Sequence, residues 1–388
     1  MAMKVVVVGA GIVGAACAFH AVAAGLDVTV LDRGPVGAGT TSRGEGNILL
    51  SDKEPGPELE LARLSRGLWG EVAAELGPES VEFETKGGLV VASTPEALTV
   101  LHAFAARQAE SGVRTEPVER PGDLEPHIAP GLPGGVHYPQ DAQVQPVLAA
   151  AGLLRAAVRR GARTHTGEAV AAVTGTGGRI TGVRTADGSV LAADAVVNAA
   201  GTWGGEVGRR LGAPVEILPR RGFVLVTEPL PPMIRRKVYS ADYVANVASS
   251  DAGLETSCVV EGTRAGTILI GASRERVGFD TAMNPAVVTA LAARACRLFP
   301  FLRGVHLIRA YRGFRPYCPD HLPVVGPDPR VPGVVHACGH EGAGIGLAPA
   351  TGALVTAQLL GRPWRGADPA AHTGLLPDRF LTTGGAPK

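Results

Sequence analysis

The sequence is poor in aromatic residues and carries almost no net charge. Aromatic residues make up 4% of the 388 residues, and 37 Lys and Arg oppose 36 Asp and Glu, which leaves a net charge of +1. Proteins that bind nucleic acid or membrane surfaces have a basic excess as their electrostatic footprint. Its absence argues against both classes, so we expect no nucleic-acid partner and no membrane partner.

Cysteine is scarce as well, and no two cysteines form a C-x-x-C motif. Zinc knuckles, iron–sulfur clusters and disulfide frameworks depend on closely spaced or paired cysteines. The pattern therefore argues against a metal site and favours reduced thiols in a cytoplasmic protein. The five cysteines are Cys17, Cys258, Cys296, Cys318 and Cys338.

One stretch, residues 5–26, has no Asp, Glu, Lys or Arg and follows Lys4. This pattern is shared by signal peptides and membrane spans. However, the stretch contains Gly9, Gly11, Gly14 and His20, and it continues directly into a strand-like segment at 27–32. We therefore predict that it belongs to the folded core and not to a targeting or membrane segment.

Glycine, in contrast, is abundant, with 53 residues and no collagen-like period. The hydrophobic content of 45% is enough for a sizeable core, so disorder is not expected. The glycines are therefore expected to serve tight turns and the close approach of the backbone to a ligand.

A glycine-rich turn between a strand and a helix opens the chain. Residues 3–8 are short, apolar and β-branched, which predicts a buried parallel strand. The motif G-x-G-x-x-G follows at 9–14, a helix is expected to end near Gly25, and a second strand ends at Asp32. In such a unit the glycines admit a pyrophosphate to the helix N-terminus, and the acid binds a ribose diol. The order of these parts predicts a dinucleotide site.

The segment after the second strand helps to choose between NAD and FAD. Residues 37–47 form a polar loop rich in glycine and hydroxyl groups, whereas an NAD domain would usually continue with a helix and a strand. Such a loop can follow an extended cofactor from its pyrophosphate to its ring. A surface loop without a ligand is the alternative.

Further along, the patterns predict helices, buried strands and one long irregular connection. Helices are expected within 52–77 and at 95–112, 146–161 and 285–299, and strands at 88–91, 169–173, 180–186, 189–192, 194–201, 223–226 and 267–271. Residues 117–146 are rich in proline and glycine, which predicts an irregular connection. A glycine cluster at 339–346 precedes an apolar helix that runs to Leu360.

These patterns predict an α/β plus α+β protein with two domains. A Rossmann-like FAD-binding domain would comprise residues 1–50, 145–213 and 305–388. A substrate domain with a mostly antiparallel sheet would comprise residues 51–144 and 214–304.

Four stretches in order resemble the FAD-dependent D-amino-acid oxidase superfamily, which includes glycine oxidase and sarcosine oxidase. They are residues 9–14, 40–47, 199–203, and 313–316 continuing through 339–352. Residues 43–48 and 339–352 are most similar to a narrower group within it. This group holds the FAD-binding subunits of opine oxidase, hydroxyproline dehydrogenase and hydrogen cyanide synthase.

The resemblance implies non-covalent FAD and assigns roles by position. The residues expected to bind FAD are Gly9, Gly11, Ile12, Val13, Gly14, Asp32, Arg33, Thr40, Thr41, Ser42, Gly46, Asn47, Val170, Ala200, Gly201, Trp203, Gly342, Ala343, Gly344, Ile345 and Gly346. Where some sarcosine oxidases carry a flavin-linked cysteine, this chain has Arg315, which is why no covalent link is expected.

Arg315 also falls where amino-acid-oxidising members hold the substrate carboxylate. A planar guanidinium can bind a carboxylate through two hydrogen bonds. Tyr243 and His340 are further candidates for the catalytic site, and Tyr317 is a candidate for the pocket wall. For each of these side chains a purely structural role is the alternative.

The resemblance implies oxidation of the CH–NH bond of an amino acid or amine that carries a carboxylate, by hydride transfer to flavin N5. Electrons could pass to dioxygen or, as in the narrower group, to redox partner subunits. Two other functions stay open at this point, a nicotinamide-dependent dehydrogenase and a non-catalytic FAD-binding assembly subunit.

Overall fold

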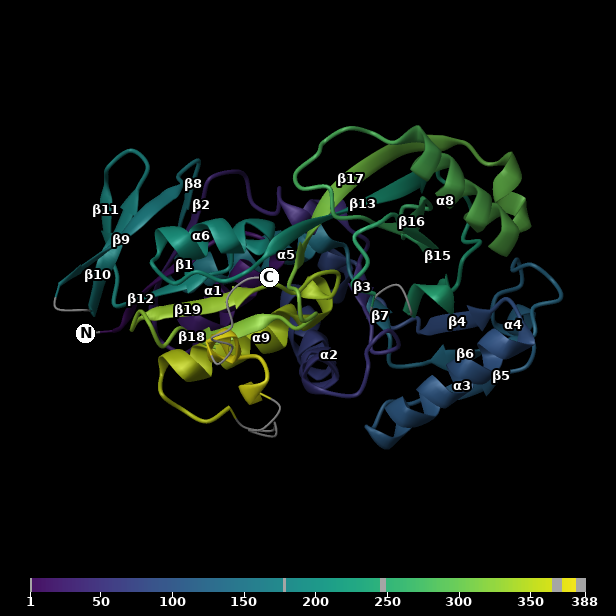
Figure 1. Cartoon of the computed structure of the whole chain (residues 1–388), viewed down its shortest axis with the longest axis horizontal. Helices are drawn as coiled ribbons and strands as arrows, with labels where there is room; N and C mark the ends of the chain where they lie inside the picture. Colours follow the sequence, from purple (N-terminus) through teal and green to yellow (C-terminus); the bar gives the residue numbers. More distant parts are fainter. Residues whose placement is uncertain (1, 177–178, 245–248, 365–371, 382–388) are drawn as a thin grey trace.

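The computed structural model describes residues 2–176, 179–244, 249–364 and 372–381. Within them two large sheets lie side by side along the longest axis of the molecule, as Figure 1 shows. Between the strands expected at 169–173 and 180–186, where a turn at 175–178 is predicted, Gly177 and Gly178 lie outside the described residues.

A six-stranded sheet contains the N-terminal strand at its centre. Its order is β18 (Val324–Pro327), β19 (Val334–Cys338), β12 (Ala195–Asn198), β1 (Lys4–Val8), β2 (Asp27–Asp32) and β8 (Arg163–Thr166). All neighbours are parallel except β18 and β19. β1 is almost entirely valine and buried, as a strand covered on both faces should be. The predicted parallel sheet is confirmed.

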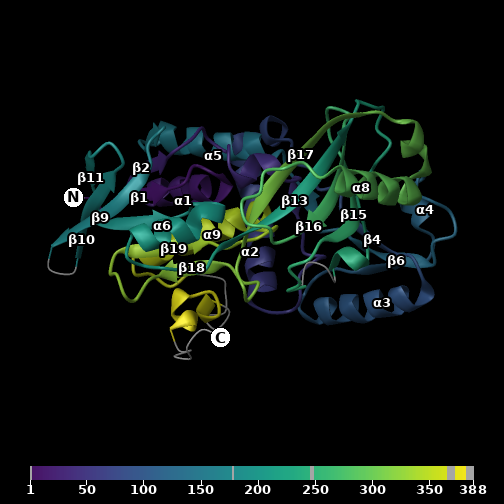
Figure 2. The ribbon, with the colours of Figure 1, turned by 45° about the horizontal axis from the view of Figure 1, so that its top comes forward.

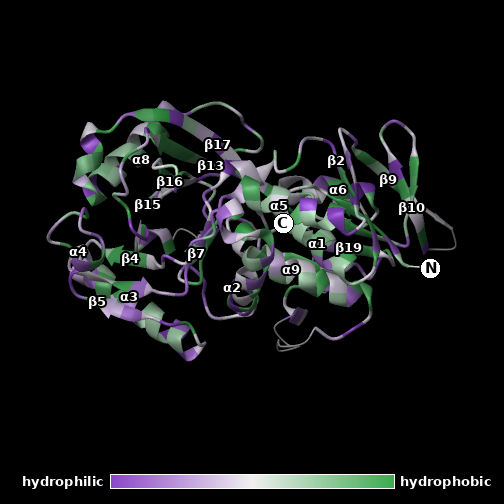
Figure 3. Ribbon diagram, turned by 180° about the vertical axis from the view of Figure 1, so that it is seen from behind, coloured by the Kyte–Doolittle hydropathy of each residue, from purple (hydrophilic) through white to green (hydrophobic). Residues whose placement is uncertain are grey.

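Helices cover this sheet and make its core. α1 (Ile12–Ala23) packs against α5 (Pro146–Arg159) and α9 (Gly344–Leu359), and α9 also packs against α2 (Pro57–Leu76). Figure 3 shows hydrophobic colour over much of α1 and α9. In the first turn of α9, the carbonyl oxygens of Ile345 and Gly346 accept hydrogen bonds from Trp69 Nε1 at 3.0 and 3.1 Å. The last helix is thereby fixed beside the first one.

An eight-stranded sheet forms the other half. Its order is β17 (Leu307–Tyr317), β13 (Leu218–Thr227), β16 (Ile268–Arg274), β15 (Glu255–Gly262), β14 (Lys237–Ser240), β4 (Gly88–Ala92), β6 (Gly134–Tyr138) and β5 (Glu116–Val118). Its pairs are antiparallel except β14 with β4. Figure 2 shows α8 (Pro285–Leu298) and α3 (Pro95–Glu110) beside different parts of this sheet. The mostly antiparallel character is confirmed.

Two smaller sheets and several short helices complete the described chain. β11 (Val190–Ala192), β10 (Arg179–Thr185) and β9 (Val170–Thr176) form one sheet, and β3 (Asn47–Ile48) pairs with β7 (Ala142–Gln143). The short helices are η1 (Thr40–Arg43), η2 (Pro78–Val81), α4 (Pro121–Leu124), η3 (Gly201–Trp203), α6 (Gly204–Arg210), η4 (Pro300–Gly304) and η5 (Pro377–Phe380).

Two sequence-based expectations were wrong in part. Residues 117–146 are not an irregular connection, because β5, α4, β6 and β7 fall wholly or partly within them. Glycine in β6 is there for close packing of strands, since a Cβ at Gly135 would lie 2.3 Å from the carbonyl oxygen of Val90. The loop at 37–47 contains the helical turn η1. The division of the chain into two domains remains a proposal.

The described ranges also bear on the apolar run at 5–26. The run is divided between β1 and α1, with the glycine turn between them. No helix in the described ranges combines the length and the apolar character needed to cross a bilayer.

Candidate active site

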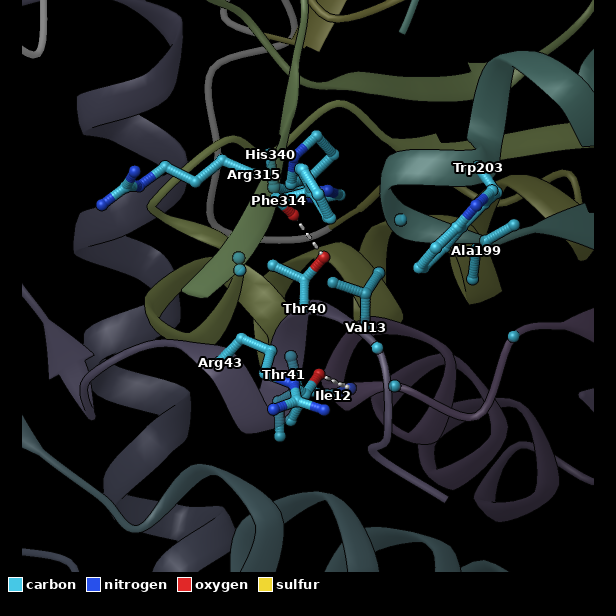
Figure 4. Close-up of a pocket in the computed structure, with 18 of the residues that line it drawn as sticks. Ile12, Val13, Thr40, Thr41, Arg43, Ala199, Trp203, Phe314, Arg315 and His340 are labelled. Carbon is cyan, nitrogen blue, oxygen red and sulfur yellow. Dashed lines mark hydrogen bonds between the residues drawn. The ribbon is translucent and has the colours of Figure 1, made fainter. Parts of the chain in front are cut away.

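A cavity of about 370 Å³ extends from the carboxyl ends of β1 and β2 to β17, the edge strand of the eight-stranded sheet. Ligands of open parallel sheets bind outside the carboxyl ends of the strands. Figure 4 shows Trp203 and Ala199 at one side of this cavity and Arg315 at the other. The cavity is therefore long enough to bring segments from both large sheets to one ligand.

The glycine turn brings three elements together at the cavity floor. Gly9 has φ +115°, and a Cβ there would lie 2.3 Å from the carbonyl oxygen of Ala199, the residue that follows β12. A Cβ at Gly14 would lie 1.8 Å from the carbonyl oxygen of Gly9. Only glycine at both positions allows α1 to start this close to β1. The open N-terminus of α1 then presents backbone N–H groups and positive dipole to the cavity.

Asp32 ends β2 beside this turn and also lines the cavity. Its Oδ2 accepts a hydrogen bond from the N–H of Ala10 at 2.6 Å, and its Oδ1 accepts one from Gly34 at 2.8 Å. An ionised carboxylate has about four acceptor positions. Asp32 can therefore stabilise the turn and still accept a ligand hydroxyl.

The loop after β2 is held against both halves of the molecule. Thr41 Oγ1 accepts a hydrogen bond from the N–H of Ile12 at 3.0 Å, which caps one donor of α1. Thr40 Oγ1 donates to the carbonyl oxygen of Phe314 on β17 at 2.8 Å. Both hydrogen bonds are dashed in Figure 4. They position the loop along the length of the cavity.

At the end near β9 the cavity wall is aromatic and polar. The guanidinium of Arg33 lies 4.3 Å from the ring centre of Trp203, which also stacks on Phe279. The carbonyl oxygen of Val170 accepts a hydrogen bond from Arg210 Nη1 at 2.6 Å. Flat apolar surfaces beside such polar groups suit a nucleobase.

Arg315 lies at the opposite end of the cavity, on β17. A Cβ at Gly222 on the paired strand β13 would lie 2.2 Å from Arg315 Nη1, so the glycine makes room for the guanidinium. Nη1 donates to the carbonyl oxygen of Ser273 at 2.8 Å. Burial lowers the pKa of Arg315, and the nearby positive charge of Arg274 adds to this effect. Among the described residues, no carboxylate oxygen lies within 4.0 Å of this guanidinium.

Two other predicted residues lie in the same cavity wall. His340 is buried, and its Nε2 lies 3.0 Å from Thr351 Oγ1. Burial lowers the pKa of His340 to about 4, so its ring is neutral near pH 7. Tyr243 is buried beneath the guanidinium of Arg274, which lies 4.6 Å from its ring centre, and burial raises the pKa of Tyr243.

Most of the predicted residues line the cavity. Those that do are Gly9, Gly11, Ile12, Val13, Asp32, Arg33, Thr40, Thr41, Asn47, Val170, Ala200, Gly201, Trp203, Tyr243, Arg315, His340, Gly342, Gly344 and Ile345. Five predicted residues, Gly14, Ser42, Gly46, Ala343 and Gly346, are not part of its lining. Ser42 Oγ instead donates to the carbonyl oxygens of Ala38 and Gly39 within its own loop. Tyr317 is also absent from the lining and is buried near Arg220, Arg276 and His321.

Several lining residues were not among the predicted sites. Arg43 and Glu45 flank Gly44 within the predicted loop, so their place in the sequence could have indicated a role at the site. Gly222 and Val224 on β13 line the cavity through a strand pairing that no local pattern reveals.

These features define a protein that binds a dinucleotide cofactor at the edge of its parallel sheet. The glycines, the open helix end, Asp32 and the length of the cavity all fit such a group. The family described as FAD dependent oxidoreductase (DAO) matches residues 4–358. The chain belongs to this family, and FAD is its cofactor. The alternative of a nicotinamide-dependent dehydrogenase is therefore wrong.

Individual relatives agree with this assignment. The chain is 30% identical over 372 residues to glycine oxidase of Pseudomonas putida, covering 93% of this chain and 95% of that protein. It is 32% identical over 232 residues to hydrogen cyanide synthase subunit HcnC of Pseudomonas aeruginosa, covering 60% of this chain and 52% of that protein. The chain is an FAD-dependent amine or amino-acid oxidoreductase of the glycine oxidase family, as the sequence predicted.

Solved structures support the fold. The structure of glycine oxidase from Geobacillus kaustophilus has a TM-score of 0.84 and 26% identity, covering 94% of this chain and 97% of that one. L-proline dehydrogenase from P. horikoshii has a TM-score of 0.86 and 21% identity, covering 98% of each chain, which bears on the fold alone.

Proposed function

We propose that this enzyme oxidises the CH–NH bond of an amino acid or secondary amine that carries a carboxylate. The observation that carries this proposal is Arg315, a half-buried cation in the cavity whose guanidinium has no carboxylate oxygen of the described residues within 4.0 Å. Removing a guanidinium from water without an ion-pair partner is costly, and desolvation accordingly lowers the pKa of Arg315. A substrate carboxylate would compensate its charge and would be fixed in orientation by two parallel hydrogen bonds.

The remaining residues of the cavity have positioning roles in this proposal. The hydrogen bond from Nη1 to Ser273 fixes the guanidinium plane on β17. Tyr243 forms an apolar wall beside it, since the high pKa of its phenol keeps the hydroxyl neutral. The glycine turn and the Thr40 loop would hold FAD, which supplies a hydride acceptor for the α-carbon when bound. The oxidised product, an imine, would be hydrolysed by water.

Anaerobic reduction of the bound flavin tests the proposal. The FAD-loaded enzyme should lose its absorbance near about 450 nm with members of an amino-acid and amine panel. Arg315→Ala should lower kcat/KM by about 100-fold, because truncating one partner of a buried charge pair costs about 2–5 kcal/mol. Arg309→Ala, an exposed arginine on the same strand, is the matched control and should keep the wild-type value. Normal kcat/KM in Arg315→Ala on every accepted substrate contradicts the proposal.

A second candidate concerns the electron acceptor. The similarity to a protein named as a subunit of hydrogen cyanide synthase supports a role within a heteromeric dehydrogenase. In that case the purified chain should reduce an artificial dye with its substrate and release almost no hydrogen peroxide. Stoichiometric peroxide release by the purified chain in air would favour an oxidase instead.

A further inference from the structure

A buried carboxylate in the cavity wall has one oxygen without a hydrogen-bond partner among the described residues. Glu45 lines the cavity and is only 6% exposed, and its Oε1 atom is buried without a hydrogen-bond partner. Across the part of the chain that the structure describes, no cation lies within ion-pair distance of Glu45. Burial deprives a carboxylate of water, and proteins normally compensate with hydrogen bonds or a cation. Glu45 is therefore open to compensation by a ligand.

A glycine in the eight-stranded sheet leaves room for this carboxylate. Glu45 lies between η1 and β3, and Oε1 reaches β16 at Gly271. A Cβ at Gly271 would lie 2.2 Å from Oε1, so any larger residue would displace the carboxylate. The position of Glu45 thus depends on a glycine in a distant strand.

One buried cation on which the charge of Glu45 acts, Lys237, already has a carboxylate partner. Lys237 Nζ lies 2.5 Å from Glu261 Oε2 and also donates to Asn47 Oδ1. Glu261 Oε1 in turn accepts a hydrogen bond from the N–H of Gly46. Lys237 therefore has its own carboxylate partner and makes no ion pair with Glu45.

Glu45 lies within electrostatic range of the proposed carboxylate anchor. The charge of Glu45 contributes to the pKa of both Arg315 and Tyr243, and all three side chains line one cavity. The cavity thus offers a half-buried guanidinium and a buried carboxyl group to the same ligand. An α-amino acid carries the complementary pair of groups, a carboxylate and an amine.

We propose that Glu45 is the amine-binding residue of this enzyme, whose carboxylate accepts a hydrogen bond from the N–H of a substrate held through its own carboxylate by Arg315. This inference rests on the proposed function. Two charge-assisted contacts at opposite ends of a small molecule fix its α-carbon between them. The site should therefore select amines with at least one N–H over nitrogen-free acids of the same shape.

Two unreactive acids of matched size test this selection by binding alone. Pyrrole-2-carboxylate presents a ring N–H, whereas 2-furoate presents a ring oxygen at the same place. Each is titrated into the FAD-loaded enzyme, and Kd is measured by calorimetry. The wild type should prefer pyrrole-2-carboxylate by at least about tenfold, which is what one hydrogen bond to a charged group supplies.

Variants at Glu45 assign the preference to its carboxylate. Glu45→Ala should weaken pyrrole-2-carboxylate about tenfold and leave 2-furoate within about twofold, so that the preference disappears. Glu45→Gln keeps the shape of the side chain and should reduce the preference to about threefold. Glu110→Gln, at an exposed residue of α3, is the control and should keep the wild-type preference. The FAD content of each variant is measured from its visible spectrum.

Three outcomes would overturn the inference. Equal affinity of the wild type for the two acids would show that no group of the site accepts a hydrogen bond from the ring N–H of pyrrole-2-carboxylate. A wild-type preference retained in both Glu45 variants would assign it to another residue. Failure of the wild type to bind either acid would overturn the carboxylate anchor at Arg315 and the proposed function together, which separates this result from the first two.

Discussion

Replacing Gly14 by alanine should destabilise the protein, whereas the same change at Gly67 should stabilise it. Both glycines lie inside helices, Gly14 in α1 and Gly67 in α2. At Gly14 the new Cβ would lie 1.8 Å from the carbonyl oxygen of Gly9, about 1.6 Å short of an ordinary contact of 3.4 Å. At Gly67 nothing lies within 4 Å of the new Cβ.

The sizes of the two effects follow from these distances. Alanine gains about 0.5–1 kcal/mol over glycine inside a helix, and at Gly67 this gain should be realised in full. At Gly14 the helix must move away from β1, and overpacking of this kind costs about 1–3 kcal/mol or more. The cost exceeds the gain, so the net loss at Gly14 should be about 1–2 kcal/mol. The same movement opens the N-terminus of α1 away from the cofactor.

Thermal unfolding with and without added FAD measures both effects. Gly67→Ala should raise Tm slightly and bind FAD as the wild type does. Gly14→Ala should lower Tm by a few degrees in the cofactor-free protein and gain less from added FAD. A Gly14→Ala variant with the wild-type Tm and full FAD affinity would refute the reasoning, because it would show that α1 and β1 are not packed as described.

Three further predictions concern pH, packing and the cofactor. Because the pKa of His340 is lowered to about 4 from 6.5, the unfolded chain binds the extra proton and stability should fall as pH falls through this window. Between pH 7 and pH 4 the free energy of unfolding should fall by up to about 3 kcal/mol less in His340→Gln than in the wild type, as measured by urea unfolding. An equal fall in the two proteins would contradict this prediction. Trp69→Ala should cost about 3–5 kcal/mol in urea unfolding and release α9, whereas an unchanged midpoint would contradict the packing. Acid precipitation should give a colourless pellet and a yellow supernatant, and a yellow pellet would disprove non-covalent FAD.

The fold could be predicted where the pattern is local. The strand, glycine turn and helix of residues 3–32 depend on neighbours in sequence, and the structure confirms them. β6 was missed because its first residues, Gly134 and Gly135, are typical of turns. They are glycines because a partner strand lies too close for a side chain at position 135, which no local pattern reveals.

The same division applies to the candidate site. The cofactor end is built largely from one continuous motif, so most of its residues could be named from the sequence. The opposite end depends on pairing between distant strands. The proposed role of Glu45 depends on its position beside Gly271 and in the same cavity as Arg315, and these three residues come from separate parts of the chain. The arrangement therefore becomes visible only in three dimensions.

The position of the first strand in the six-stranded sheet has a consequence for biosynthesis. β1 is translated long before α9, the helix that packs on α1 and contributes Gly344 and Ile345 to the cavity lining. A nascent chain that stops before residue 334 lacks both β19 and α9. Flavin capture should therefore follow translation of these elements, and interrupted chains should carry no redox-active group into the cell.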